Sequence, residues 1–415
     1  MPDLYKIDRL YVFFIAVYLA EGLVGIAYEP ISYLLKDGLG LGPAQSAAFV
    51  AWMTLPFLFK PVLGVLSDAF PLRGRRRVPW LMLSAGFAAA GWGALAFLPA
   101  YRYGPTLFLL TAVNVGIVFS DVLCDGVMVE RGQAGDKTGL YQAVQIGTLY
   151  ACALATGLGG GWLSKNASTR TVFGLTALFP ALILLGALLV PEDPGPPGAP
   201  RRAAGGLAVL VKDRRSWAVA AVILLVNFTP FQGTAFFYFQ NEHLRFSKVM
   251  IGALSSLDGV SGLLGAALFW RLYNRTASWR GARLRLDAAR LARLSTWASV
   301  PLTLLYLGYR GQASALLLTA LLGAVGVAAR LSLMDLAARA APAHGEAAGF
   351  ALFMSVFNLA AWGSNAAGAA VYGALAPAGP RRAIDVLIVS AAACSALAIP
   401  LLRFLPESRP PEEPA

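Results

Sequence analysis

Three acidic side chains interrupt long apolar stretches in the first half of the chain, at Glu21, Asp121 and Asp125. An ionisable side chain in hydrocarbon costs at least about 2.5–3.5 kcal/mol on insertion scales, so each is a candidate for function. Asp121 and Asp125 are four residues apart, which places them on one face of a helix. Two carboxylates this close in a low dielectric should not both ionise, so one is expected to keep its proton. We therefore predict that the three residues couple proton movement. The alternative is a structural pair neutralised by Lys60 or by arginines in a loop.

One apolar stretch of the second half carries both a cation and an acid, Arg330 and Asp335. The planar guanidinium of Arg330 offers a fork that fits a carboxylate, so we predict that it binds an anionic substrate. The alternative is that Arg330 is the buried partner of Asp335. Asp335 lies nearer the end of the stretch, where we predict a gate residue. Lys60 and Asp258 add one charge of each sign to other apolar stretches.

These charges require long helices to position them, and the composition indicates that the helices lie in lipid. Of the 415 residues, 57% are hydrophobic and 13% are charged, whereas soluble domains carry about 25% charged residues. A membrane-spanning helix needs about 20 predominantly apolar residues. The sequence therefore predicts an all-α membrane protein with twelve transmembrane helices, at 9–35, 44–68, 79–99, 105–130, 138–163, 171–190, 216–240, 249–271, 291–310, 313–338, 346–374 and 383–404.

The net charge of +12 reflects orientation in the membrane rather than binding to nucleic acid. If the twelve spans cross in turn, most of the 34 Lys and Arg residues lie in loops on the side of the N-terminus. Positive charge in short loops marks the cytoplasmic side. Both termini are therefore predicted to be cytoplasmic, with the protein in the cell (inner) membrane and the lipid bilayer as its surroundings. The two histidines, His243 and His344, lie in separate loops, so no metal, cofactor or enzyme site is expected.

The two halves of the chain resemble each other. Residues 125–139 are echoed by 335–349 at a constant offset of 210 residues. Two like-built hydrophobic halves are typical of a transporter whose substrate path lies between them. The basic loop 271–293 is expected to form a short amphipathic helix. We expect an N-terminal six-helix bundle, a Pro- and Gly-rich cytoplasmic linker, a C-terminal six-helix bundle and a disordered tail, over 1–190, 191–214, 215–405 and 406–415.

The loop after the second apolar stretch combines a glycine, an acid four residues later and clustered arginines, as Gly64, Asp68, Arg75 and Arg76. This pattern resembles the loop 2–3 signature of the major facilitator superfamily. Gly64 allows close approach of helices, and Asp68 can cap a facing helix N-terminus or hold an arginine. The arginines can reach Glu130 at the end of the fourth stretch. We predict a latch that gates the cytoplasmic side; the alternative is that the arginines only set the topology.

Three segments carry a more specific resemblance. Phe59-Lys60-Pro61 with Ser67-Asp68, the acidic run from Asp121 to Glu130, and the run from Pro342 to Asn358 resemble the folate–biopterin transporter family of the superfamily. This resemblance implies a major facilitator fold of two pseudo-symmetric six-helix bundles. It also implies a secondary active transporter that moves folate- or pterin-like organic anions with protons by alternating access. The alternatives are a carrier of another anion or amphiphile, and a transport-dead membrane scaffold.

A flat heteroaromatic substrate needs aromatic faces for stacking and side-chain amides for hydrogen bonds. Ordinary packing is the alternative for each aromatic residue, and contact between helices is the alternative for the polar ones. The candidates for stacking are Tyr28, Phe231, Tyr238 and Trp362, and the candidates for hydrogen bonding are Gln145, Asn227, Gln232, Asn358 and Asn365.

Overall fold

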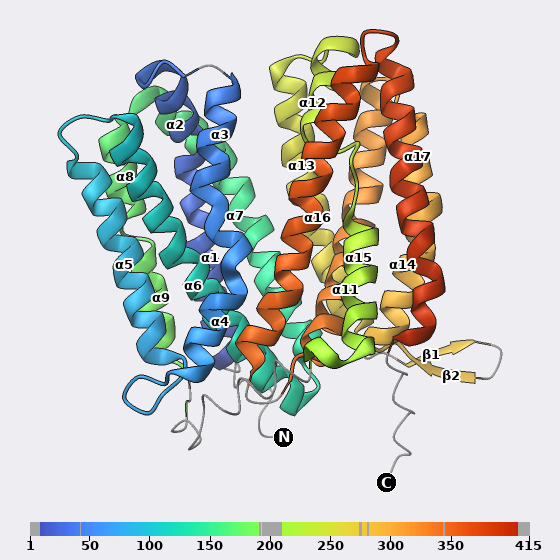
Figure 1. Ribbon diagram of the computed structural model, residues 1–415, viewed down its shortest axis with the longest axis horizontal. Helices are drawn as coiled ribbons and strands as arrows, with labels where there is room; N and C mark the ends of the chain where they lie inside the picture. Colours follow the sequence, from blue (N-terminus) through green and yellow to red (C-terminus); the bar gives the residue numbers. More distant parts are fainter. Residues whose placement is uncertain are drawn as a thin grey trace, which may run out of the picture. The chain divides into compact units, whose positions relative to one another are not determined.

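The chain is a membrane protein built almost entirely of helices. The computed structural model (Figure 1) describes residues 9–41, 43–190, 192, 210–273, 276–279, 282–342 and 345–405. Within these ranges, eight helices are long and apolar enough to cross a membrane. Most of the expected linker, all of the expected tail and His344 lie outside the described residues. The chain divides into two compact units.

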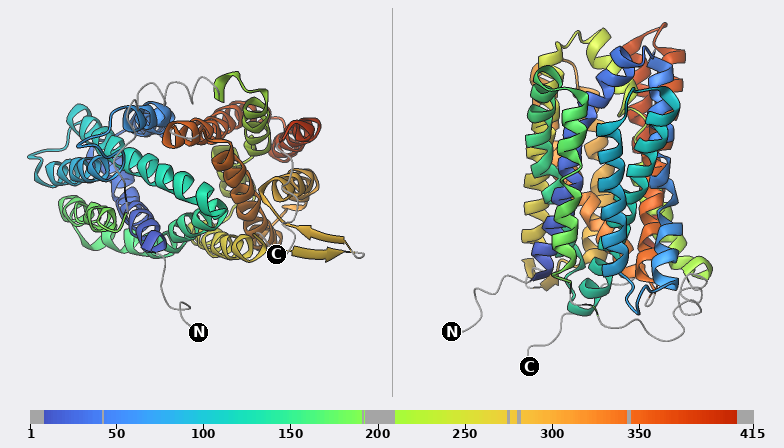
Figure 2. Two further views of the ribbon diagram at one scale, coloured as in Figure 1. Left: turned by 90° about the horizontal axis from the view of Figure 1, so that it is seen from below. Right: turned by 90° about the vertical axis from the view of Figure 1, so that its left-hand side faces the viewer.

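The first unit contains Met1–Lys137, Val144–Ala208 and Ala341–Leu352. Its helices include α1 (Arg9–Val24), α2 (Tyr28–Tyr33), α3 (Pro43–Thr54), α4 (Lys60–Ala69), α5 (Val78–Phe97), α6 (Tyr103–Gly135), α8 (Thr169–Thr176) and α9 (Pro180–Ala187). It also takes in most of α7 (Thr138–Asn166) and the start of α16 (Glu346–Leu375). Helix α5 packs lengthwise against α6, α8 and α9 (Figure 2).

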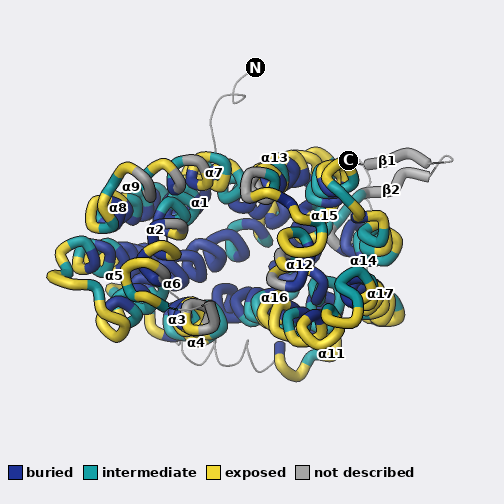
Figure 3. The backbone as a smooth tube through the Cα atoms, turned by 90° about the horizontal axis from the view of Figure 1, so that it is seen from above, coloured by how far each residue is buried: buried dark blue, intermediate teal, exposed yellow. Residues whose placement is uncertain are grey.

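Helix α6 lies in the core of the first unit. Every residue from Gly116 to Val129 is buried, as the dark blue tube of Figure 3 shows. A helix that is apolar nearly all round is expected to be enclosed by its neighbours on all sides. Asp121 and Asp125 lie within this buried stretch, so their carboxyl groups must find partners inside the unit.

Proline and glycine divide several of the expected spans into shorter helices. In the first unit, Gly25–Ala27 and Leu55–Phe59 form 3₁₀ turns, and the second of these contains Pro56. Pro180 begins α9 after a short turn that follows α8. Proline cannot donate the backbone hydrogen bond that a continuous helix needs. The breaks therefore follow from the sequence, although we expected continuous spans.

The second unit contains Thr138–Ala143, Val209–Ala340 and Phe353–Ala415. Its elements include α11 (Arg214–Asn227), α12 (Thr234–Tyr238), α13 (Lys248–Leu272), α14 (Ala288–Leu304), α15 (Gln312–Ala340), the remainder of α16, α17 (Pro380–Ala398) and a final 3₁₀ turn (Ile399–Phe404). Helix α13 packs along α15, and α14 packs against both α15 and α17. Each unit thus includes the first residues of a helix whose remainder belongs to the other unit. These helices are α16 for the first unit and α7 for the second.

In the second half, one expected span contains an interruption, and strands replace one expected helix. The expected span over 216–240 is interrupted, because α11 ends at Asn227 and α12 begins only at Thr234. Pro230 and Gly233, the latter with a φ of 73°, occupy the intervening turn. The expected amphipathic helix within 271–293 is instead an antiparallel hairpin of β1 (Thr276–Trp279) and β2 (Ala282–Arg285), which projects from the helices of this unit (Figure 2).

Helix packing in the second unit yields a stability prediction. A Cβ atom at Gly265 of α13 would clash with the carbonyl oxygen of Ala324 of α15, whereas one at Gly326 would meet nothing within 4 Å. We expect Gly265→Val to lower the unfolding free energy by about 1–3 kcal/mol through overpacking, measured as a lower Tm in detergent. Gly326→Val is the matched control, and equal losses in the two variants would contradict this packing.

Candidate functional site

A buried polar cluster in the first unit surrounds the two predicted acids of α6. The hydroxyl oxygen of Tyr18 on α1 lies 3.0 Å from Oδ1 of Asp121 and 3.0 Å from Oδ1 of Asp125. Lys60 of α4 forms an ion pair with Oδ2 of Asp121. Gln145 of α7 donates to Oδ1 of Asp125 over 3.3 Å. A tyrosine hydroxyl has one proton, so it donates to only one carboxylate at a time.

Glu21 of α1, the third predicted acid, also belongs to this cluster. Its charge interacts with those of Asp121 and Lys60. Its Oε1 atom is buried and has no hydrogen-bond partner among the described residues. Glu21 also lines a cavity of about 400 Å³ between residues of α1, α2 and α7, together with Tyr28 and Thr156. The cluster therefore contains three carboxyl groups and one lysine.

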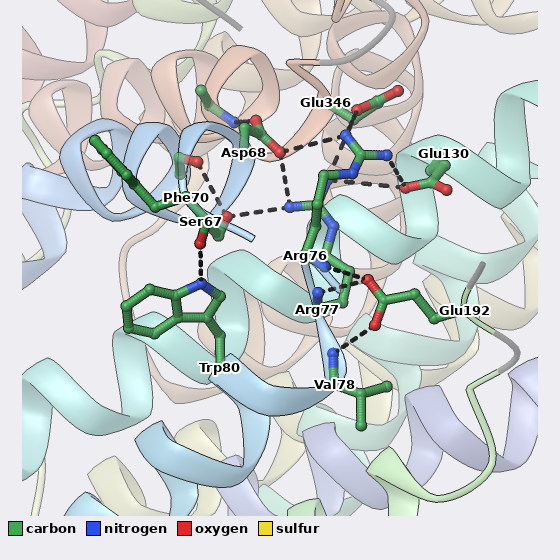
Figure 4. Close-up of polar contacts among 12 residues, drawn as sticks. Ser67, Asp68, Phe70, Arg76, Arg77, Val78, Trp80, Glu130, Glu192 and Glu346 are labelled. Carbon is green, nitrogen blue, oxygen red and sulfur yellow. Dashed lines mark hydrogen bonds and ion pairs between the residues drawn. The ribbon is translucent and has the colours of Figure 1, made fainter. Parts of the chain in front are cut away.

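A second group of charges in the first unit, the arginine cluster, consists of Asp68, Arg76, Arg77, Glu130 and Glu346 (Figure 4). Nη1 of Arg77 lies 2.8 Å from Oδ1 of Asp68. Arg76 reaches Glu346 over 3.1 Å and Glu130 over 3.0 Å. Burial alone lowers the pKa of Arg77, but the carboxylates of Asp68, Glu130 and Glu346 more than offset this, so the pKa lies above its usual value. Arg77 is thus a permanent cation.

The arginine cluster holds the start of α16. The backbone N–H of Ala348 donates to Oδ2 of Asp68 over 2.9 Å. A Cβ atom at Gly64 would lie 2.6 Å from the backbone of Ala348, so only glycine permits this approach. Asp68 therefore both caps a facing helix and holds an arginine. Arg75, in contrast, is exposed, and no ion pair is found for it within the described residues.

Glu192, which the sequence did not indicate, caps α5. Its carboxylate accepts hydrogen bonds from the backbone N–H groups of Arg76, Arg77 and Val78, over 2.7, 2.7 and 2.9 Å (Figure 4). Arg77 at the N-cap position makes no capping hydrogen bond with its side chain. The first N–H groups of a helix need acceptors, so the absence of Ser, Thr, Asp or Asn at this helix start was the available signal. The acceptor lies more than 100 residues away in sequence.

In the second unit, Asp335 lies at the centre of a smaller cluster. Arg339 of the same helix pairs with Oδ2 of Asp335 over 3.1 Å, and Thr138 donates to Oδ1. The hydroxyl of Tyr273 accepts from the N–H of Gly139 over 3.2 Å and donates to Asp335 over 3.3 Å. Burial, aided by the charge of Asp335, raises the pKa of Tyr273 to about 12, so its hydroxyl stays protonated. This cluster therefore holds the start of α7.

Arg330 is not the partner of Asp335, which corrects the alternative considered from the sequence. Its guanidinium is exposed and lies 5.7 Å from the ring centre of Phe357 on α16. An arginine over an aromatic ring makes a cation–π contact and leaves its N–H groups available. Asn358, the next residue on α16, is half-buried. Arg330 stays the predicted anion-binding residue of the second unit.

The remaining predicted substrate residues are dispersed. Phe231 is 1% exposed and packs against Phe236 and Tyr306, so the packing alternative applies to it. Asn227 donates to a carbonyl of its own helix. Tyr28 and Trp362 are 61% and 59% exposed, and Gln232 is also exposed. Tyr238 lines a separate cavity of about 590 Å³ with Glu242 and His243 in the second unit.

Comparison with known proteins identifies relatives along most of the chain. A sequence model of the BT1 family matches residues 21–413. A folate-biopterin transporter of Synechocystis sp. is 31% identical over 356 residues, covering 83% of this chain and 71% of that protein. Folate transporter 2 of Plasmodium falciparum is 26% identical over 267 residues, covering 63% and 58%. The crystal structure of FucP, a major facilitator superfamily transporter in the outward conformation, superposes with a TM-score of 0.71 at 13% identity, covering 96% and 98%. The fold is therefore the major facilitator fold.

The cap on α5 yields a prediction about local stability. Glu192→Gln removes the charge and leaves a single carbonyl oxygen to accept from three N–H groups. Because a helix cap contributes about 1 kcal/mol, we expect amide hydrogen exchange at residues 76–78 to accelerate about fivefold, as measured by mass spectrometry. Glu130→Gln is the matched control, since Glu130 contacts arginine side chains but not these amides. Unchanged exchange in Glu192→Gln would argue against the cap.

Proposed function

Because the chain belongs to the BT1 family and has the facilitator fold, we propose that it is a proton-coupled secondary active transporter for folate- or pterin-like organic anions. The likeness to a folate-biopterin transporter over 83% of the chain supports this substrate class. The mechanism would be alternating access, in which a substrate site is exposed in turn to the two sides of the membrane. The distribution of Lys and Arg supports cytoplasmic termini and a location in the cell (inner) membrane.

The proposal of proton coupling rests on an excess of negative charge around α6. Three carboxyl groups, those of Glu21, Asp121 and Asp125, lie near one lysine, Lys60. With all three ionised, two negative charges would be left uncompensated in a low dielectric, which is costly. Binding a proton removes one of them. Lys60 neutralises the charge of Asp121 in an ion pair, so Asp125 and Glu21 are the groups available to take up the proton.

The arginine cluster would act as the cytoplasmic latch. It joins the loop before α5 to the start of α16, a helix that continues into the second unit. Alternate exposure of a central site requires such contacts to form and break during the cycle. Arg330 would contribute a positive charge for the carboxylates of the substrate. Its contact with Phe357 leaves the planar fork of the guanidinium open for such a group.

Uptake of labelled folate into proteoliposomes tests this function. We expect an inward proton gradient to stimulate uptake by the wild type. Asp125→Asn keeps a group that can bond with Tyr18 and Gln145 and leaves the Lys60–Asp121 pair intact, so it should fold. It should lose the stimulation while it still exchanges folate without a gradient. Asp258→Asn, a change of the same kind on α13 of the second unit, should behave as wild type.

Two other results would count against the proposal. Stimulation that survives in Asp125→Asn would place the proton elsewhere. Absence of folate or reduced-folate uptake by folded wild-type protein, under any gradient, would leave the facilitator fold standing and assign the transporter to another anion or amphiphile.

A further inference from the structure

Glu21 differs from the other acids of the polar cluster in having no hydrogen bond. Asp121 bonds to Lys60 and Tyr18, and Asp125 bonds to Tyr18 and Gln145. Among the described residues, none donates to Glu21, and its Oε1 atom is buried. A buried acceptor without a donor is costly, and such a group in a native protein calls for an explanation such as a functional role. Glu21 is therefore an acceptor with no partner of its own.

The surroundings of Glu21 fit a flat ring. It lines a cavity of about 400 Å³, within the range of about 300–1,000 Å³ for small-molecule sites. Glycines 22, 25 and 157 contribute backbone without side chains to the wall. The ring of Tyr28, on the same wall, is 61% exposed and offers a face for stacking. All of these residues belong to the first unit.

A carboxylate in the wall of this cavity favours a ligand ring with two adjacent hydrogen-bond donors on one edge. A carboxylate accepts two parallel hydrogen bonds, as it does from the fork of an arginine. The 2-amino-4-oxopyrimidine edge of a pterin presents the same pattern, with the N3–H and the 2-amino group as adjacent donors. A 2,4-dioxopteridine (lumazine) has the same ring, but the 2-amino donor is replaced by a carbonyl acceptor. That carbonyl oxygen would lie next to a carboxylate oxygen, and the two acceptors would repel each other.

We infer that Glu21 recognises the pterin ring of the substrate by accepting hydrogen bonds from its N3–H and 2-amino groups. Glu21 is then the residue that determines specificity for 2-aminopteridines, in addition to its place beside the proton-binding acids. This inference rests on the proposed function, because it assigns one part of a folate- or pterin-like substrate to one side chain.

Competition binding to the purified full-length protein, with pterin and lumazine displacing labelled folate, tests this assignment. The wild type should prefer pterin over lumazine by at least about tenfold, because a site built to bond a donor discriminates against an analogue that lacks it. Glu21→Gln replaces one acceptor oxygen by an amide donor. Its amide matches the N3–H and 2-carbonyl of lumazine, so the preference should be abolished or reversed.

Two further variants separate this role from others. Glu242→Gln makes the same change at a glutamate lining the cavity of the second unit, and it should keep the wild-type preference. Glu21→Asp keeps the carboxylate on a shorter arm, so it should retain a preference for pterin with weaker binding. If Glu21→Gln does not fold, the preference of the wild type and of Glu21→Asp still tests the inference.

The outcomes distinguish the two proposals. Wild-type protein that binds neither folate nor pterin would overturn the proposed function and this inference with it. Folate binding with equal displacement by pterin and lumazine would overturn the inference and leave the function standing. Glu21→Gln that binds folate with an unchanged preference for pterin would do the same.

Discussion

A charge within the hydrocarbon of a membrane persists only where another charge or a set of donors compensates it. The cluster around α6 and the cluster around Asp335 follow this constraint, with Glu21 as the exception. In the first, Lys60 compensates Asp121, and Tyr18 and Gln145 supply donors to Asp125. In the second, Arg339 compensates Asp335. The positions of α1, α4, α6 and α7 around the first cluster are thereby fixed by polar contacts that their apolar surfaces could not specify.

Three helix starts obtain their caps from distant parts of the chain. Asp68 accepts from the start of α16, Glu192 from the start of α5, and the Tyr273 hydroxyl from the start of α7. The first N–H groups of a helix need acceptors, and in a protein with few polar residues a single side chain can position a whole helix. The echo of Gly139 by Gly349 has a related origin. A Cβ atom at Gly139 would clash with Tyr273, and one at Gly349 would clash with Pro342.

Features that arise within one stretch of the sequence, such as helices and i, i+4 pairs, could be predicted. Contacts between residues that are far apart in the sequence mostly could not. Apolar length predicted membrane helices, and the spacing of Asp121 and Asp125 predicted a shared face. The pair of Asp335 and Arg339 is also local, at i and i+4, and could have been preferred over Arg330 on that ground. Tyr18 and Glu192 act on residues more than 100 positions away, and spacing carries no information on such partners. The burial of Phe231 likewise depends on Tyr306, from a different segment.

The first cluster also suggests why substrate and proton would be linked. Tyr18 and Glu21 are three residues apart on α1, so they share a face of that helix. The hydroxyl of Tyr18 lies at equal distance from Asp121 and Asp125, and Glu21 interacts electrostatically with both acids. On the proposals above, donors of a pterin ring at Glu21 would offset negative charge within the same cluster that takes up the proton. The two binding events would then change each other's free energy without any long pathway, because coupling between sites is reciprocal and here the sites are neighbours.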